Sequence, residues 1–258
     1  MTKRQSLFVF ALTALAALAP VTAFAGEGEG LLEANTHLSD PASLQRGAKL
    51  FMNYCSGCHS LKYLRYGRMA DDLGLSEKQV QENLNFTGAK YLDHVNVAMN
   101  PTDAANWFGK TPPDLSLEGR ARGPNWIYTY LKSFYADESR PSGWNNTVLP
   151  NASMPNVLWQ LQGVAHPVTE PKHGDEPCAK GEFEGKCIKD LAVDDAHKGQ
   201  LTPEEYDRAA LDITAFLQYA AEPAALQRTQ YGWKVILFLA FFTFLAYLLK
   251  REYWRDVH

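Results

Sequence analysis

The feature that most constrains the fold is the pentapeptide Cys55-Ser56-Gly57-Cys58-His59, which has the C-x-x-C-H spacing of a c-type haem attachment site. In such a site two thiols bond to the vinyl groups of one porphyrin, and the adjacent imidazole binds the iron. Two alternatives remain open: a structural disulfide between Cys55 and Cys58, and a thioredoxin-like redox pair. A redox pair requires a βαβ setting, whereas the residues before Cys55 predict a helix. We therefore expect one covalently bound haem c, with His59 as an axial ligand.

The N-terminus of the 258-residue chain predicts export across a membrane. Lys3 and Arg4 precede an apolar run from Leu7 to Ala19, and Ala23-Phe24-Ala25 has the small-x-small pattern of a cleavage site. This pattern predicts a signal peptide at residues 1–25, with an uncleaved N-terminal anchor as the alternative. Export agrees with the motif, because bacterial c-type haem is attached on the periplasmic side, where disulfides also persist.

A second apolar run predicts one transmembrane helix over residues 231–253. Val235 to Leu249 contains no charged residue, and a helix rising about 1.5 Å per residue crosses the hydrocarbon core of about 30 Å over this length. Tryptophan and tyrosine lie near both ends, as at membrane interfaces. A buried core helix is the alternative. Together with the signal peptide, the span predicts a single-pass protein of the bacterial inner membrane, with a periplasmic domain at 26–230 and a cytoplasmic tail at 254–258.

The charge of the exported part bears on its partners. Residues 26–230 contain 19 Lys and Arg against 27 Asp and Glu, a formal charge of −8. An acidic excess argues against nucleic acid as a partner. It favours a basic soluble partner that is attracted over a long range, although a solvated acidic surface without a partner is equally compatible.

Helical periodicity predicts a mainly α fold for the exported domain. The first helix begins at Pro41 and continues to Cys55, and the small residue Gly47 on its apolar face allows another helix to cross closely. The last helix follows the cap residue Thr202 and Pro203, and we expect it to pack on the first before it leads into the span. Shorter helices are predicted at Ser76–Leu84 and Asn125–Tyr135, and irregular segments at Gly109–Gly123 and from Ala136 to about Leu201.

The second axial ligand of a c-type haem is commonly a methionine. The exported domain offers Met52, Met69, Met99 and Met154. Met52 is too close to the motif to reach the opposite face of the porphyrin, and Met69 leaves little chain to wrap around it. Met154 comes late in the long irregular segment and is the predicted ligand. Met99, a histidine or an open site remain the alternatives.

The remaining cysteines, Cys178 and Cys187, are not a second haem motif, because eight residues separate them and no histidine follows. In an exported segment rich in charge they predict a disulfide bond that closes a loop. Two free thiols are the alternative.

Beyond the haem motif, several short segments follow one another in a specific order. They are GAKLFMNYCSGCH at Gly47–His59, TPPDLS at Thr111–Ser116, RARG at Arg120–Gly123, Met154-Pro155, and AFLQYAAEP at Ala215–Pro223, before the single C-terminal span. With this order, nearly all of the mature chain resembles the cytochrome c1 family, the haem-bearing subunits of quinol–cytochrome c oxidoreductase. The resemblance implies a class I cytochrome c-like haem domain with long irregular loops.

The resemblance also implies residue roles and partners. Cys55 and Cys58 would carry the haem, Arg120 would bind a haem propionate, and Pro112 and Pro113 would line the haem edge. The implied function is electron transfer from a Rieske iron–sulfur protein to a cytochrome c, beside cytochrome b, with no enzyme activity of the subunit alone. The alternatives are a c-type cytochrome subunit of another membrane oxidase or dehydrogenase, or else a haem peroxidase or gas sensor.

Overall fold

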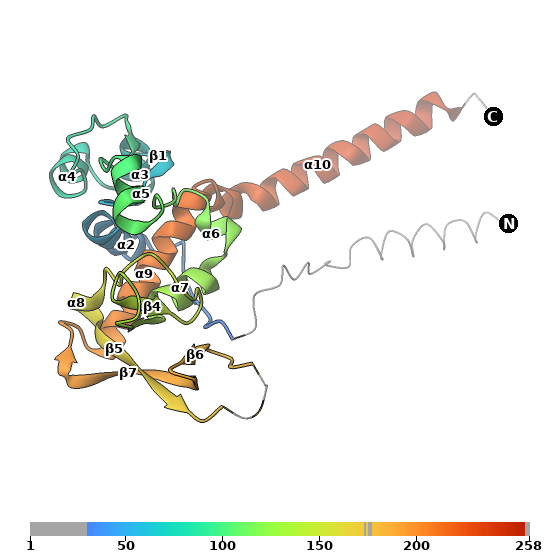
Figure 1. Ribbon diagram of the computed structural model, residues 1–258. Helices are drawn as coiled ribbons and strands as arrows, with labels where there is room; N and C mark the ends of the chain where they lie inside the picture. Colours follow the sequence, from blue (N-terminus) through green and yellow to red (C-terminus); the bar gives the residue numbers. More distant parts are fainter. Residues whose placement is uncertain (1–29, 173, 175–176, 256–258) are drawn as a thin grey trace.

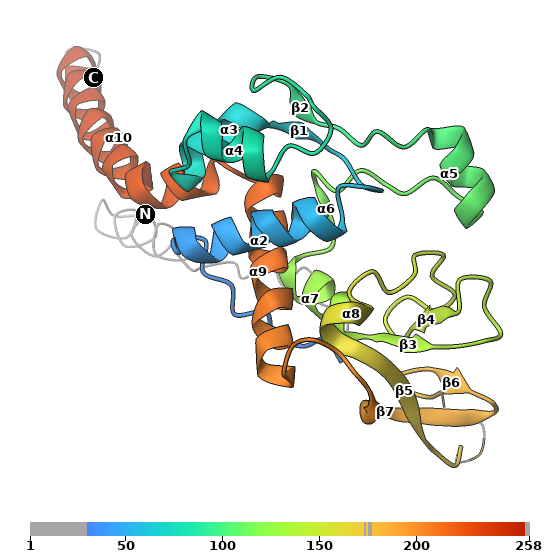
Figure 2. The ribbon, with the colours of Figure 1, turned by 90° about the vertical axis from the view of Figure 1, so that its left-hand side faces the viewer.

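Two long helices cross at the centre of the domain (Figures 1 and 2). The computed structural model describes residues 30–172, 174 and 177–255, so the predicted signal peptide lies outside the described residues. α2 spans Pro41–Tyr54, and the side chain of Asp40 caps its first turn. α9 spans Pro203–Ala221, where Thr202 and Glu205 form a reciprocal capping box. Both helices therefore begin where the sequence predicted.

The crossing of α2 and α9 depends on Gly47. A Cβ atom added to Gly47 would lie 2.0 Å from the backbone oxygen of Asp212 and 2.8 Å from Cβ of Phe216, so only glycine fits at this contact. The predicted close packing of the first and last helices is thus confirmed. The Asp212 carboxylate, nearly buried at the crossing, accepts hydrogen bonds from Arg46 Nε at 2.6 Å and Ser43 Oγ at 2.5 Å.

Apolar side chains from both helices form the centre of one continuous core. The aromatic rings of Phe51 and Phe216 lie 5.6 Å apart between centroids. The largest fully buried side chains are Tyr66, Tyr219, Phe51, Phe134, Phe216, Leu44, Leu61, Leu64, Met69, Leu73, Leu158 and Ile213. This core fixes the end of α2, and with it the position of the haem motif.

Shorter helices surround the crossing. They are α3 at Tyr66–Leu73, α4 at Glu77–Asn83, α5 at Pro101–Phe108, α6 at Glu118–Ala121, α7 at Pro124–Lys132 and α8 at Trp159–Gln162. α4 and α7 correspond to the two short helices that the sequence predicted. α7 ends earlier than expected because Phe134 and Tyr135 enter a strand.

α7 is joined to α9 by a polar cluster. Tyr128 and Lys132 on α7 both donate hydrogen bonds to the carboxylate of Asp207 on α9. Partial burial alone would raise the pKa of Asp207, but the hydrogen bonds from Lys132 and Tyr128 outweigh it, so the pKa is lowered. This carboxylate therefore favours its charged, hydrogen-bonded form in the folded chain.

The segment from Ala136 to Leu201 is more ordered than the sequence predicted. Among the described residues the strands form three short sheets. β1 (Leu61–Arg65) pairs with β2 (His94–Val95) earlier in the chain, and β3 (Phe134–Ala136) pairs with β4 (Trp144–Asn146). The third sheet has the order β5 (Gly163–Glu170), β7 (Lys186–Lys198) and β6 (Glu182–Phe183). Of the residues that the structure describes, 46% are helical and 16% lie in strands, so the expected mainly α class holds only in part. The prediction of an irregular segment was wrong because β5 and β7 pair antiparallel although fifteen residues of chain, 171–185, separate them.

A disulfide bond closes the tip of the three-stranded sheet of β5, β7 and β6, which we call the β arm. Cys178 and Cys187 are bonded, with their Cα atoms 5.2 Å apart. Cys187 lies in β7, whereas Cys178 precedes β6. The bond therefore links the chain just before β6 to β7, the central strand of the sheet.

The last helix, α10 (Ala225–Tyr253), extends away from the domain (Figure 1). Its segment Gln230–Tyr253 is long and apolar enough to cross a membrane, with a mean hydropathy of 2.0 and none of its most apolar window buried. Among the described residues this is the one helix with that property. Its exposure argues against the alternative of a buried core helix.

Candidate functional site

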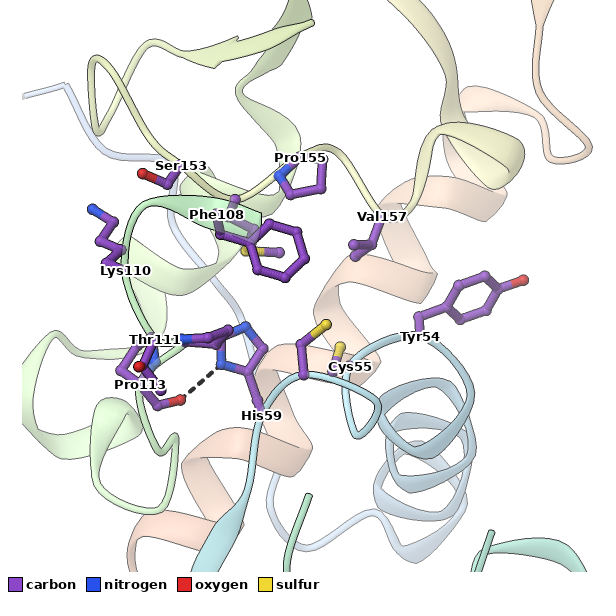
Figure 3. Close-up of a pocket in the computed structure, with 13 residues that line it drawn as sticks. Tyr54, Cys55, His59, Phe108, Lys110, Thr111, Pro113, Ser153, Pro155 and Val157 are labelled. Carbon is purple, nitrogen blue, oxygen red and sulfur yellow. Dashed lines mark hydrogen bonds between the residues drawn. The ribbon is translucent and has the colours of Figure 1, made fainter. Parts of the chain in front are cut away.

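A cavity lies where the end of α2 meets two loops (Figure 3). Its empty volume, including the open mouth, is about 560 Å³. Three segments supply the mostly apolar lining: Tyr54, Cys55, Cys58 and His59; Phe108, Lys110, Thr111, Pro112 and Pro113; and Ser153, Met154, Pro155 and Val157. The cavity thus unites the haem motif with residues about 50 and 100 positions further along the chain.

The haem motif forms a tight turn at the end of α2. Cys55 still donates its backbone N–H to Phe51, as a helical residue does, whereas Cys58 and His59 both donate to the carbonyl of Cys55 at 3.1 and 2.9 Å. The turn brings both thiols and the imidazole to the cavity wall, with no flexible linker between them. Their relative position is therefore fixed by the helix end.

The two thiols of the motif are free and poorly ionised. Cys55 is buried and Cys58 is half-buried, and no bond joins them. Burial raises the pKa of the Cys55 thiol to about 12 and also raises that of Cys58. A redox-active cysteine pair requires a lowered pKa, and this pair follows a helix rather than a strand. The structure therefore favours neither a Cys55–Cys58 disulfide nor a thioredoxin-like pair.

His59 is oriented by a single hydrogen bond. Its Nδ1 lies 2.8 Å from the backbone oxygen of Pro113, drawn as the dashed line in Figure 3. Because a carbonyl only accepts, Nδ1 carries the proton and Nε2 is left unprotonated and free to bind a metal. Burial lowers the pKa of His59, although the bond to Pro113 opposes this shift. The neutral imidazole is the form that ligates iron.

The loop that carries Pro113 is itself fixed to the chain beyond His59. Leu115 donates its N–H to the carbonyl of Ser60 at 2.9 Å. The carboxylate of Asp114 accepts the N–H of Lys62 at 2.9 Å, and Ser116 Oγ accepts that of Tyr63 at 3.1 Å. Thus the Pro-Asp-Leu-Ser segment holds the backbone oxygen that orients the imidazole.

Buried asparagines hold the loop that carries Met154. Asn146, only 1% exposed, donates to the carbonyl of Tyr130 at 2.9 Å and accepts the N–H of Val148 at 2.9 Å. Asn156 accepts the N–H of Leu158 at 3.0 Å. In this loop, side-chain hydrogen bonds take the place of the backbone hydrogen bonds of a regular strand ladder. They position Met154 at the cavity.

The Met154 sulfur accepts a hydrogen bond from a partly buried tyrosine. The hydroxyl of Tyr130 donates to Sδ at 3.6 Å. Tyr130 is itself stacked on Trp126, with ring centroids 4.9 Å apart, and packs edge-on against Phe134. Burial raises the pKa of Tyr130 to about 12, so the hydroxyl keeps its proton and remains a donor.

The other predicted residues divide into two groups. Pro112 and Pro113 line the cavity, whereas Arg120 is exposed on α6, outside the residues that line it. Met52 and Met69 are buried in the core, and Met99 lies outside the cavity lining. The sequence reading had not singled out Lys110, the cation that lines the cavity, although it directly precedes the Thr-Pro-Pro segment. Other lining residues that it had not singled out are Phe108, Ser153 and Val157, whereas Tyr54, Thr111 and Pro155 lie in the short segments quoted for the family resemblance, without a role of their own.

The donor set fits a haem c. The cavity offers two unbonded thiols separated by two residues, an unprotonated ring nitrogen and a thioether sulfur, in a mostly apolar surround. Covalent haem attachment with His and Met axial ligands requires these groups. Phe108 and Pro155 lie across the cavity from His59 (Figure 3), as expected for side chains on the two sides of a flat group.

Comparison with known proteins gives one family. A sequence model of the Cytochrome C1 family matches residues 32–257. Cytochrome c1 of Allochromatium vinosum is 52% identical over 93% of this chain and 96% of its own length. The ammonia monooxygenase gamma subunit of Nitrosomonas europaea is 42% identical over 93% and 95%. Cytochrome b/c1 of Bradyrhizobium diazoefficiens is 26% identical, over 85% of this chain and 34% of that protein.

The family match covers most of the chain, including the cavity, α9 and α10. The chain therefore belongs to the cytochrome c1 family, the haem subunits of the bc1 complex, which carry one covalently bound haem c.

Proposed function

We propose that the chain takes electrons from a Rieske iron–sulfur protein and passes them to a cytochrome c, from a periplasmic domain that α10 anchors beside cytochrome b. The observation that carries this proposal is the convergence of Cys55, Cys58, His59 and Met154 on one cavity. The name of the Bradyrhizobium relative, cytochrome b/c1, supports the partnership with cytochrome b. The formal charge of −8 over residues 26–230 supports a basic acceptor.

The residues at the cavity have separate roles in holding the group. Cys55 and Cys58 would form the two thioether bonds, and His59 Nε2 and Met154 Sδ would be the axial ligands. A haem c bound in this way supplies one-electron iron chemistry and requires no bond to break in the protein. The backbone oxygen of Pro113 keeps the imidazole neutral and oriented.

Several residues favour the reduced state. A thioether is a soft, neutral ligand that raises the reduction potential. Tyr130 donates toward the sulfur of Met154 and so withdraws electron density from it. The mostly apolar lining, including Phe108 and Val157, would surround the haem with few polar groups. Together these features suit a site that accepts an electron readily and returns it without rearrangement.

Two cations are candidates for binding the propionates. Arg120 is the residue that the family resemblance proposes, and its guanidinium can bind a carboxylate through two hydrogen bonds. Lys110 lines the cavity itself. Arg120 remains the proposed partner of a propionate, and Lys110 is proposed to add a second positive charge at the cavity.

The proposed topology is that of an exported, singly anchored protein. It consists of a signal peptide at 1–25, a haem domain at 26–230, a membrane span at 231–253 and a cytoplasmic tail at 254–258. The exposed, apolar α10 supports the span, and Lys250 and Arg251 in its last turn support a cytoplasmic C-terminus.

A second candidate is a haem subunit of another membrane oxidase. The relative named ammonia monooxygenase gamma subunit is the observation that favours it. The candidates differ in their partners, since only the first requires cytochrome b and a Rieske protein.

Purification of the native membrane complex through this chain tests the proposal. We expect an optical spectrum of haem c together with b-type haems, and a Rieske protein among the subunits. Ferrocytochrome c should form on addition of quinol. The Cys55→Ser/Cys58→Ser double variant is the control, and it should lack the haem c band. A complex that contains haem c but neither b-type haem nor a Rieske protein would overturn the proposal.

A further inference from the structure

Away from the haem cavity, two histidines and an aspartate meet on the β arm. His166 lies on β5, and Asp194 and His197 lie near the end of β7. One ligand atom from each lies within 4.8 Å of the ligand atoms of the other two, and all three side chains are exposed. From this geometry we propose that His166, Asp194 and His197 bind a divalent transition-metal ion of the zinc type.

An irregularity in the β5–β7 ladder creates the cluster. Ala165 pairs with Val193 and His166 with Ala192, but the next paired residues are Gly163 and Lys198. Four residues of β7, 194–197, are therefore accommodated opposite a single residue of β5. The extra length forms a turn that carries Asp194 and His197 back over the strand that holds His166.

The turn is held by Asp194. Its Oδ1 accepts the backbone N–H of Ala196 at 3.0 Å and that of His197 at 2.9 Å. The Nδ1 of His197 lies 2.7 Å from the same oxygen. This bond leaves Nε2 of His197 available as a ligand. The rings of His197 and His166 pack edge to face, with centroids 5.4 Å apart.

Two glycines fix the turn against the rest of the domain. A Cβ on Gly163, whose φ is +96°, would lie 2.6 Å from the backbone oxygen of His197, and one on Gly199 would lie 2.3 Å from that of Leu161. The chain then continues through backbone bonds from Gln200 to Gln160 and from Leu201 to Leu161. The candidate ligands therefore stand on a fixed backbone, although their side chains are exposed.

Two imidazoles and one carboxylate suit a borderline cation such as Zn²⁺. Zinc binds such ligands at about 2.0–2.2 Å, which places neighbouring ligand atoms roughly 3.3 Å apart. The three atoms must therefore approach one another by about 1.5 Å at most, and rotation of exposed side chains allows this. Three protein ligands leave at least one position for water, the arrangement of an open zinc site.

Zinc titration of the full-length, haem-loaded protein in detergent tests the proposal. In the holoprotein the motif thiols are occupied by thioether bonds, and a histidine-free affinity tag avoids competing imidazoles. We expect calorimetry to show one Zn²⁺ per chain. His166→Ala, His197→Ala and Asp194→Asn should each weaken binding by at least about tenfold. His37→Ala, which removes a histidine of the N-terminal segment, is the matched control and should not change it.

X-ray absorption at the zinc edge provides a second readout, with two imidazole nitrogens and oxygen ligands expected. Unchanged haem absorbance of the variants shows that they fold. The absence of stoichiometric binding in the unaltered protein would overturn the proposal. So would a His166→Ala/His197→Ala double variant that binds Zn²⁺ with unchanged stoichiometry and affinity.

Discussion

Replacement of Gly47 by alanine tests how the crossing of α2 and α9 determines stability. The new Cβ would lie 2.0 Å from the backbone oxygen of Asp212, whereas an ordinary carbon–oxygen contact is about 3.4 Å or longer. The two helices would have to separate by more than an ångström. Separation would also strain the bonds that Ser43 and Arg46 make to the Asp212 carboxylate.

Two opposing effects set the size of the change. Helix propensity alone favours alanine over glycine by about 1 kcal/mol in a helix interior. Overpacking of a close contact costs about 1–3 kcal/mol, and occasionally more. Because the overlap is with a backbone atom that cannot rotate away, we expect the upper end of this range. The net result is a loss of about 2 kcal/mol in the free energy of unfolding.

Guanidinium unfolding of the haem-loaded chain in detergent, followed by haem absorbance and far-ultraviolet circular dichroism, measures this loss. The midpoint for Gly47→Ala should fall by about 0.5 M. Lys49→Ala, on the exposed side of α2, is the control and should change stability by no more than about 0.5 kcal/mol. A Gly47→Ala protein as stable as the unaltered one, or more stable, would refute the packing argument.

Three further changes have defined outcomes. Tyr130→Phe removes the donor to the Met154 sulfur and should lower the haem midpoint potential by about 20–40 mV in a redox titration. Asp207 has a lowered pKa, so its stabilisation is present above the unfolded value of about 3.9 and is lost as pH falls through the folded value. Asp207→Asn should therefore reduce the loss of stability at acid pH by about 0.5–1 kcal/mol, a size that suits the partly exposed Lys132–Asp207 ion pair. Cys178→Ser/Cys187→Ser removes a disulfide bond that stabilises the fold by about 2–3 kcal/mol, because the bond lowers the entropy of the unfolded chain. Its loss should speed proteolysis within the β arm about tenfold or more.

Each of these outcomes can also fail in a specific way. An unchanged potential in Tyr130→Phe would mean that the hydroxyl does not act on the ligand. If the loss of stability at acid pH is unchanged in Asp207→Asn, other carboxylates must cause it. Proteolysis at the native rate in the double serine variant would show that strand pairing alone holds the arm.

The helices were predictable because the information for them is local. Capping at Thr202 and proline at the first position of α9 act within a few residues, and the structure confirms the helix that they predicted. Gly47 acts on a helix far along the chain, but its lack of a side chain is visible in the sequence, and the close crossing it predicted is confirmed. The haem motif and Met154 could be proposed as ligands for a related reason, since ligand chemistry restricts residue type and spacing. The structure brings these residues to one cavity.

The β arm was not predictable in the same way. β7 is mostly exposed and rich in charged residues, and β5 is only partly buried, so burial imposes a weak alternation on both strands. Their pairing is non-local, and a ladder irregularity interrupts its register. Lys110 and Tyr130 were missed because their roles depend on loops and helices that meet only in the folded chain.

Carbon monoxide binding by the reduced holoprotein tests most directly the claim that His59 and Met154 hold the haem. With both axial positions filled by protein, the unaltered chain should not bind carbon monoxide at neutral pH, and neither should Met99→Leu. Met154→Leu should bind it, because leucine has no ligand atom. Binding by the unaltered protein, or a Met154→Leu variant that stays closed to carbon monoxide, would contradict the proposed ligation.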